Sequence, residues 1–105
     1  MATLKKKPTL IDFQKYIHEI EVERNFIKQT VMDKCLMLGE EVGELFKAVR
    51  KEQKLNIDVK SKMRTVDEEC ADVLIFLLSI ANRYDIDLEK AFRDKEEINK
   101  NRKWS

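Results

Sequence analysis

The stretch TVMDKCLMLGEEVGELFKAVRKEQ at residues 30–53 decides the fold of this chain. Its apolar residues recur at alternating spacings of four and three, which indicates an amphipathic helix with a narrow contact seam. The seam comprises Val31, Cys35, Leu38, Val42, Leu45 and Val49. The pattern therefore predicts a long helix, from about Thr30 to Gln53, that packs against other helices.

A second helix with the same spacing is predicted from about Ser61 to Arg83, after an exit loop at residues 56–61. Its seam comprises Met63, Val66, Cys70, Val73, Leu77 and Ile80. Further apolar residues at 74–76 and at 78 make the second half of this helix apolar on nearly every side. A helix of this kind is buried on several sides, so we expect it to lie at a subunit interface.

Two shorter helices flank this pair. The first is predicted to run to about Phe26, and the last from about Leu88 to Lys100, with Trp104 in a short tail. Each has polar residues that favour a helix start. These candidate caps are Thr9 or Asp12 for the first helix and Asp85 or Asp87 for the last.

Length and composition give the fold class. A chain of 105 residues has room for one domain, here residues 1–105, and a core this small is buried incompletely, which favours self-association. A charged fraction of 39% with only two glycines and one proline favours long helices over hairpin-linked sheets. We therefore expect an all-α four-helix bundle that forms a homodimer or a homotetramer.

Charge and hydropathy limit the partners. The formal net charge is +1, so no strong field attracts nucleic acid or a membrane surface. The longest apolar stretch, Val73 to Ala81, is far shorter than the roughly 20 residues that span a bilayer, and the start of the chain lacks a signal-peptide pattern. We predict a cytoplasmic protein. Cys35 and Cys70 fall on the seams, which predicts buried, inert thiols.

Four acids stand out because they form two pairs, each with a spacing of three residues that places both side chains on one helix face. Every acid immediately precedes a seam residue, so the pairs should meet beside the helix contact, with Gly43 and Ala71 allowing close approach. Converged carboxylates suit magnesium, manganese or calcium, although the same spacing also occurs on solvated faces. The acids are Glu41, Glu44, Glu69 and Asp72. A di-iron bundle needs histidines on inward faces, and the chain has only His18.

The segments EEVGEL at residues 40–45 and ECADVL at residues 69–74 resemble those of the MazG-type nucleotide pyrophosphohydrolases. The resemblance extends over nearly the whole chain, including the DIDL turn at residues 85–88. It implies that the four acids hold magnesium, with manganese as the alternative. It also implies a nucleoside triphosphate substrate that is hydrolysed to nucleoside monophosphate and pyrophosphate. Glu41 would be catalytic as well as a ligand, and Glu40 would support the ligands or orient the attacking water.

Substrate binding is predicted on the last helix and near the first. Lys95, Asn99 and Arg102 share one helix face; their spacing also fits a solvated basic tail, but the family resemblance implies contacts to phosphate. Among the aromatic residues Phe13, Tyr16 and Phe26, we favour Phe26 for stacking on the base. Two alternatives stay open, a phosphoribosyl-ATP pyrophosphohydrolase-like enzyme and a non-catalytic helical interaction module.

Overall fold

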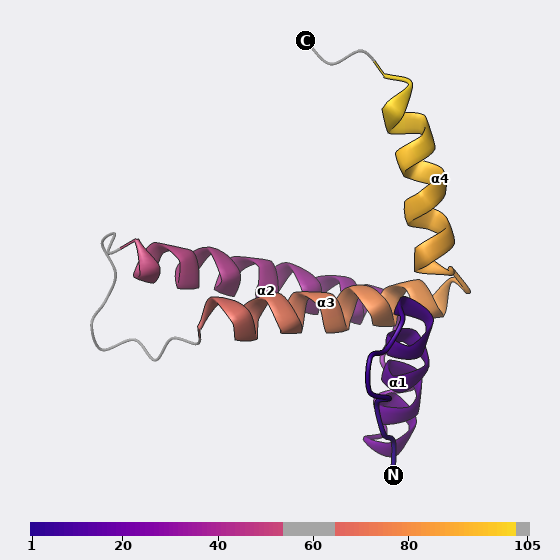
Figure 1. The fold of residues 1–105 in the computed structure, drawn as a ribbon. Helices are drawn as coiled ribbons and strands as arrows, with labels where there is room; N and C mark the ends of the chain where they lie inside the picture. Colours follow the sequence, from indigo (N-terminus) through magenta and orange to yellow (C-terminus); the bar gives the residue numbers. More distant parts are fainter. Residues whose placement is uncertain (54–64, 103–105) are drawn as a thin grey trace.

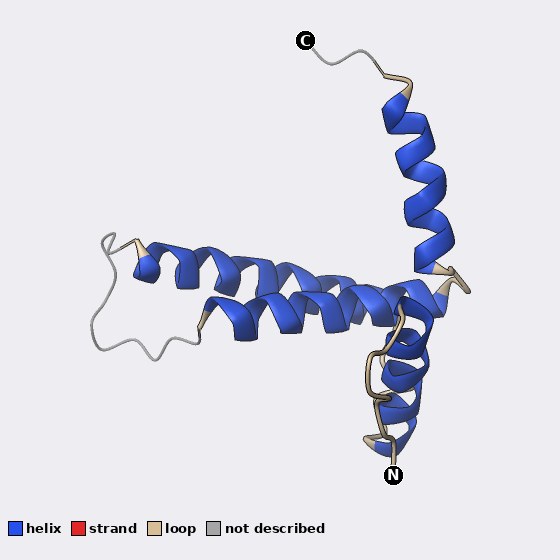
Figure 2. Cartoon of the chain, in the orientation of Figure 1, coloured by secondary structure: helices blue, strands red, loops and turns tan. Residues whose placement is uncertain are grey.

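The computed structural model describes residues 1–53 and 65–102. These residues form four helices and no strand, which confirms the all-α class (Figures 1 and 2). The helices are α1 (Leu10–Glu23), α2 (Val31–Glu52), α3 (Val66–Arg83) and α4 (Leu88–Lys100).

The first two helices begin with reciprocal caps at Thr9 and Thr30. Each threonine hydroxyl accepts a hydrogen bond from the backbone N–H of an aspartate three residues later, and that aspartate accepts one from the threonine backbone N–H. The aspartates are Asp12 and Asp33. Hydrogen bonds from the backbone N–H and the hydroxyl of Thr9 lower the pKa of Asp12 below its ordinary value. Sequence and local structure therefore agree on where α1 and α2 begin.

The end of α1 differs from the prediction. The helix stops at Glu23, and Asn25 adopts a left-handed φ of 58°. The backbone N–H of Phe26 then bonds to the carbonyl oxygen of Glu21 at 2.8 Å, which closes the helix end. The predicted end near Phe26 is therefore wrong, because this turn places Phe26 in the connection between α1 and α2.

The start of α3 also differs. Thr65 has extended backbone directly before Val66, so the predicted beginning near Ser61 is wrong. The predicted exit loop at 56–61, Met63 and Trp104 lie outside the described residues. For α4 the structure selects one of the two candidate caps: Asp87 accepts from the backbone N–H of Lys90 at 3.2 Å, whereas Asp85 takes a left-handed φ in the preceding turn.

The helices are arranged around an antiparallel pair formed by α2 and α3, and α1 crosses the end of this pair where α3 finishes (Figure 1). The core lies at that crossing, where Ile17 and Ile20 of α1 meet Leu78 of α3. Helix α4 leaves the same end in the direction opposite to α1, and none of its residues is buried. The chain therefore has one packed corner and one projecting helix.

The most deeply buried residues of α2 and α3 do not lie on the predicted seams, although most seam residues in the described part of the chain are half-buried. On α2 the buried residues are Lys34 and Ala48, and on α3 they include Glu69 and Ser79. The predicted seam residues Val49 and Leu77 are each 43% exposed. One residue corresponds to about 100° of rotation about a helix axis. The inward face of each helix therefore includes partly charged positions beside the predicted apolar row, and some residues of that row stay exposed.

Two further expectations, on the burial of the cysteines and on close helix approach at Gly43 and Ala71, also differ from the structure. Cys35 and Cys70 are free and exposed, so the prediction of buried thiols is wrong. A Cβ built on Gly43 would meet no atom of the described residues within 4 Å, and Ala71 is exposed. Close approach by another described residue therefore does not explain the glycine.

Candidate metal centre

Three carboxylates converge between α2 and α3. Glu41 comes from the middle of α2, and Glu69 and Asp72 come from the first two turns of α3. One oxygen from each of the three lies within 4.8 Å of the others, Glu69 is 1% exposed, and the other two residues are half-buried. The antiparallel pairing therefore brings together three of the four acids singled out by their spacing.

This group is suited to a divalent cation. Two like charges at this separation repel by about 3 kcal/mol at an effective dielectric near 20, and three such charges form three repelling pairs. Carboxylate oxygens are hard donors of the type that magnesium and manganese prefer. The three residues can therefore hold a divalent cation by the chemistry of their donors, and the cation would offset their repulsion.

The remaining predicted acids lie outside the group. Glu40 and Glu44 are both exposed, and neither belongs to the three-carboxylate group. Glu44 and Asp72 occupy equivalent places in the two acidic pairs, yet only Asp72 is half-buried. The two pairs are therefore alike in sequence but different in their surroundings.

The predicted phosphate-binding residues are not brought to the carboxylates within one chain. Asp72 lies about 16 Å along α3 from the end of that helix, taking 1.5 Å per residue. Helix α4, which carries Lys95 and Asn99, begins beyond that end and points away from the α2–α3 pair, with Arg102 just after it (Figure 1). Within one chain, these residues therefore lie on or just after a helix that points away from the carboxylates.

The three aromatic candidates for stacking on the base differ in burial and in position. Phe13 and Tyr16 pack against the core formed by α1 and α3, which is the common fate of aromatic residues at helical spacing. Phe26 lies in the connection between α1 and α2 and is 41% exposed. Of the three, Phe26 alone combines exposure with a place outside the core.

A buried ionic cluster, which sequence inspection missed, joins α1, α2 and α3. Glu21 is 4% exposed and accepts hydrogen bonds from the Ser79 hydroxyl at 2.5 Å and from the Arg83 guanidinium at 3.1 Å. The Lys34 ammonium lies 3.8 Å from the same carboxylate. The available signal was a lysine four residues into an amphipathic helix, one position before the predicted seam residue Cys35.

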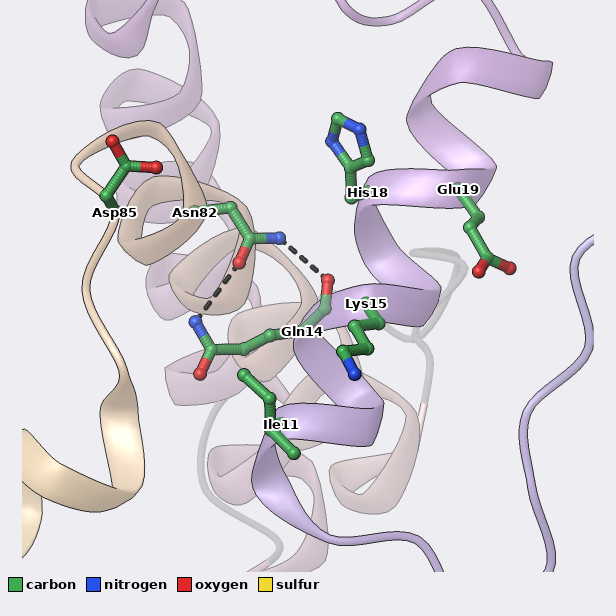
Figure 3. A pocket seen from close by; sticks show the side chains of 7 residues that line it. All are labelled: Ile11, Gln14, Lys15, His18, Glu19, Asn82 and Asp85. Carbon is green, nitrogen blue, oxygen red and sulfur yellow. Dashed lines mark hydrogen bonds between the residues drawn. The ribbon is translucent and has the colours of Figure 1, made fainter.

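A separate hollow of about 370 Å³ lies where α1 meets the end of α3 (Figure 3). Two amides dominate it: the Gln14 side chain donates to the Asn82 oxygen at 3.1 Å, and the Asn82 side chain donates to the Gln14 carbonyl oxygen at 2.8 Å. His18 also borders the hollow and is exposed. The two hydrogen bonds of this amide pair connect α1 to α3. The hollow lies at the opposite end of α3 from the carboxylates.

Comparisons with known proteins agree with this architecture. The model of the MazG nucleotide pyrophosphohydrolase domain matches residues 29–103. The chain is similar to two crystal structures of iMazG from Vibrio DAT 722. Ctag-iMazG is 29% identical with a TM-score of 0.62, covering 88% of this chain and 98% of that one. Ntag-iMazG is 30% identical with a TM-score of 0.62, covering 90% and 99%.

No curated protein matches the chain. Among the described residues, every helix is too short or too polar to cross a bilayer.

Proposed function

The chain belongs to the MazG nucleotide pyrophosphohydrolase family, and from that premise we propose that it is a magnesium-dependent enzyme that converts nucleoside triphosphates to nucleoside monophosphates and pyrophosphate. Enzymes of this family are hydrolases that act on phosphoric anhydrides. The observation that carries the proposal is the convergence of the Glu41, Glu69 and Asp72 carboxylates within 4.8 Å. The proposed role is removal of non-canonical or excess nucleotides.

In this proposal Glu41, Glu69 and Asp72 hold the cation, and Glu44 is the fourth ligand. A bound magnesium ion supplies positive charge against the phosphoryl oxygens and lowers the pKa of water, with manganese as the alternative ion. Glu41 and the exposed Glu40 are the carboxylates proposed to orient the attacking water and take its proton. Glu69 is 1% exposed and belongs to the three-carboxylate group, which supports a ligand role.

A pyrophosphate-release assay tests the proposal directly. The purified chain is given a panel of ribo- and deoxyribonucleoside triphosphates with magnesium, with manganese or with a chelator. The proposal requires pyrophosphate and nucleoside monophosphate in equal amounts, and only when a divalent cation is present. Release of inorganic phosphate instead, or turnover in excess chelator, would contradict it. Phosphoribosyl-ATP belongs in the panel because its hydrolysis would identify the alternative, a phosphoribosyl-ATP pyrophosphohydrolase-like enzyme.

Replacing Lys95 or Arg102 by alanine is expected to lower kcat/KM about tenfold, because each cation is proposed to contact the triphosphate. Magnesium binding measured by calorimetry without nucleotide should stay unchanged, since neither side chain coordinates a cation. The loss should shrink at high ionic strength, where exposed charges are screened.

Lys90→Ala is a matched control on the same helix, because the Lys90 ammonium contacts Asp94 at 2.7 Å and is not assigned to phosphate. If Lys95→Ala and Arg102→Ala match the wild type at both ionic strengths, the phosphate assignment fails.

We also propose a homo-oligomer, a dimer or a tetramer, as the working form. On α4, Phe92 is 68% exposed and Ile98 57%, and they share a helix face with Lys95. On the α2–α3 pair, Phe46 is 65% exposed and Leu74 38%. Burying such surface against a second copy is favourable at about 25 cal/mol per Å² of apolar area.

Light scattering at micromolar concentration should therefore give at least twice the chain mass. Phe92→Glu should shift the population toward monomer and reduce pyrophosphate release with it. A monomeric wild-type protein with full activity would contradict this prediction.

A further inference from the structure

Given the proposed function, on which this step rests, we propose that Lys34 is a positioning residue that holds the Phe26 ring as a platform for the base of the nucleotide. Lys34 belongs to the buried ionic cluster and carries no role in the metal site. Its assignment comes from its contacts with two aromatic rings and from its place along α2.

The Lys34 ammonium lies over two aromatic rings. It is 5.5 Å from the ring centroid of Phe26 and 5.7 Å from that of Phe76, distances at which a cation is attracted to the face of a ring. Lys34 itself is 3% exposed, whereas Phe26 is 41% exposed. The buried cation thus holds one side of a ring that remains partly open to solvent.

Two contacts from Arg83 support the same connection between α1 and α2. The Arg83 guanidinium donates to the backbone carbonyl oxygen of Phe26 at 3.4 Å and to that of Gln29. Glu21 links Arg83 to Lys34, since its carboxylate contacts both. Arg83 therefore holds the backbone at Phe26 and at Gln29, while the Phe26 ring contacts Lys34.

The register along the helix pair places this platform at a useful distance from the carboxylates. Lys34 precedes Glu41 by seven residues on α2, and Phe76 follows Glu69 by seven residues on α3. Because the helices are antiparallel, both steps lead toward the same end of the pair (Figure 1). Seven residues are two turns, or about 10 Å. A nucleotide whose phosphates lie at the carboxylates can extend its base over that span to Phe26.

The experiment separates recognition of the base from recognition of the phosphates. Lys34→Met keeps the length of the side chain and removes its charge. We expect KM for the nucleoside triphosphate to rise about tenfold with little change in kcat, because the Phe26 ring loses the cation–π contact, worth about this factor, that holds it in position. Product inhibition by pyrophosphate, which has no base, should be unchanged. Lys34→Arg retains a cation that can stack on rings and should restore most of the affinity.

Two further variants keep the proposal testable if Lys34→Met does not fold. Phe26→Leu leaves the ionic cluster intact and should raise KM in the same way, again without altering pyrophosphate inhibition. Lys47→Met is the matched control on α2, because Lys47 is exposed and should behave as wild type. A KM for Phe26→Leu equal to that of the wild type, or a parallel rise in the inhibition constant of pyrophosphate, would overturn the proposal.

Binding measured by calorimetry tests the base platform without requiring the proposed hydrolysis. The wild type and the Lys34→Met and Phe26→Leu variants are titrated with dAMP, dCMP, dGMP and dUMP, and separately with pyrophosphate plus magnesium. Weaker monophosphate binding in both variants, with unchanged pyrophosphate binding, supports the platform even if the wild type releases no pyrophosphate. Monophosphate binding equal to that of the wild type in both variants overturns the platform even if hydrolysis is confirmed.

Discussion

Replacing Glu41 by glutamine or Asp72 by asparagine is expected to abolish metal-dependent pyrophosphate release while leaving a folded helical protein. Both changes keep the shape of the side chain and remove one negative charge from the three-carboxylate group. Loss of a charged ligand should weaken magnesium binding, and the fall in kcat/KM should be about a thousandfold, equivalent to about 4 kcal/mol. The measurements are steady-state pyrophosphate release and magnesium titration by calorimetry without nucleotide.

Folding should not be harmed by these substitutions. Each removes a charge that repels two neighbouring carboxylates and keeps the shape of the side chain, so the helical fold should be retained without metal. Glu68→Gln is the matched control, because Glu68 is exposed, adjoins Glu69 in sequence and lies outside the group. Wild-type turnover in Glu41→Gln or Asp72→Asn would remove the metal-site assignment, and a comparable loss in Glu68→Gln would show that the effect is not local.

Replacing Glu21 by glutamine is expected to produce the largest loss of stability, with the free energy of unfolding falling by about 3 kcal/mol. The Glu21 side chain is 6% exposed and is the acid shared by Lys34 and Arg83, whose side chains are 4% and 19% exposed. Removing its charge leaves the buried ammonium of Lys34 without its ion pair. The cost comes mainly from that uncompensated charge and less from the lost hydrogen bond to Ser79.

Chemical denaturation at one fixed protein concentration measures this effect, since association also contributes to apparent stability. The control is Glu19→Gln on the same helix, where an exposed acid should change stability by less than about 0.5 kcal/mol. Equal unfolding free energies for Glu21→Gln and the wild type would show that the cluster contributes little net stability.

The sequence alone was sufficient for the presence and order of the four helices. Periodicity and capping residues locate a helix because its backbone hydrogen bonds are local, and the caps Thr9 and Asp87 were each one of two predicted candidates. The spacing of three residues between Glu69 and Asp72 was likewise enough to place both on one face. The acidic segments also identified the family before any geometry was known.

Tertiary structure alone decided which face of each helix turned inward. Apolar periodicity favoured burial of Cys35 and Val49, yet the chain buries Lys34 and Ala48 one position earlier. The reason is that Lys34 gains a carboxylate from α1 and two aromatic rings from other segments, and a local pattern cannot reveal partners that are distant in sequence. The packing of α2 on α3 also brings Glu41 into the carboxylate group and leaves Glu44 exposed, although both acids immediately precede a seam residue.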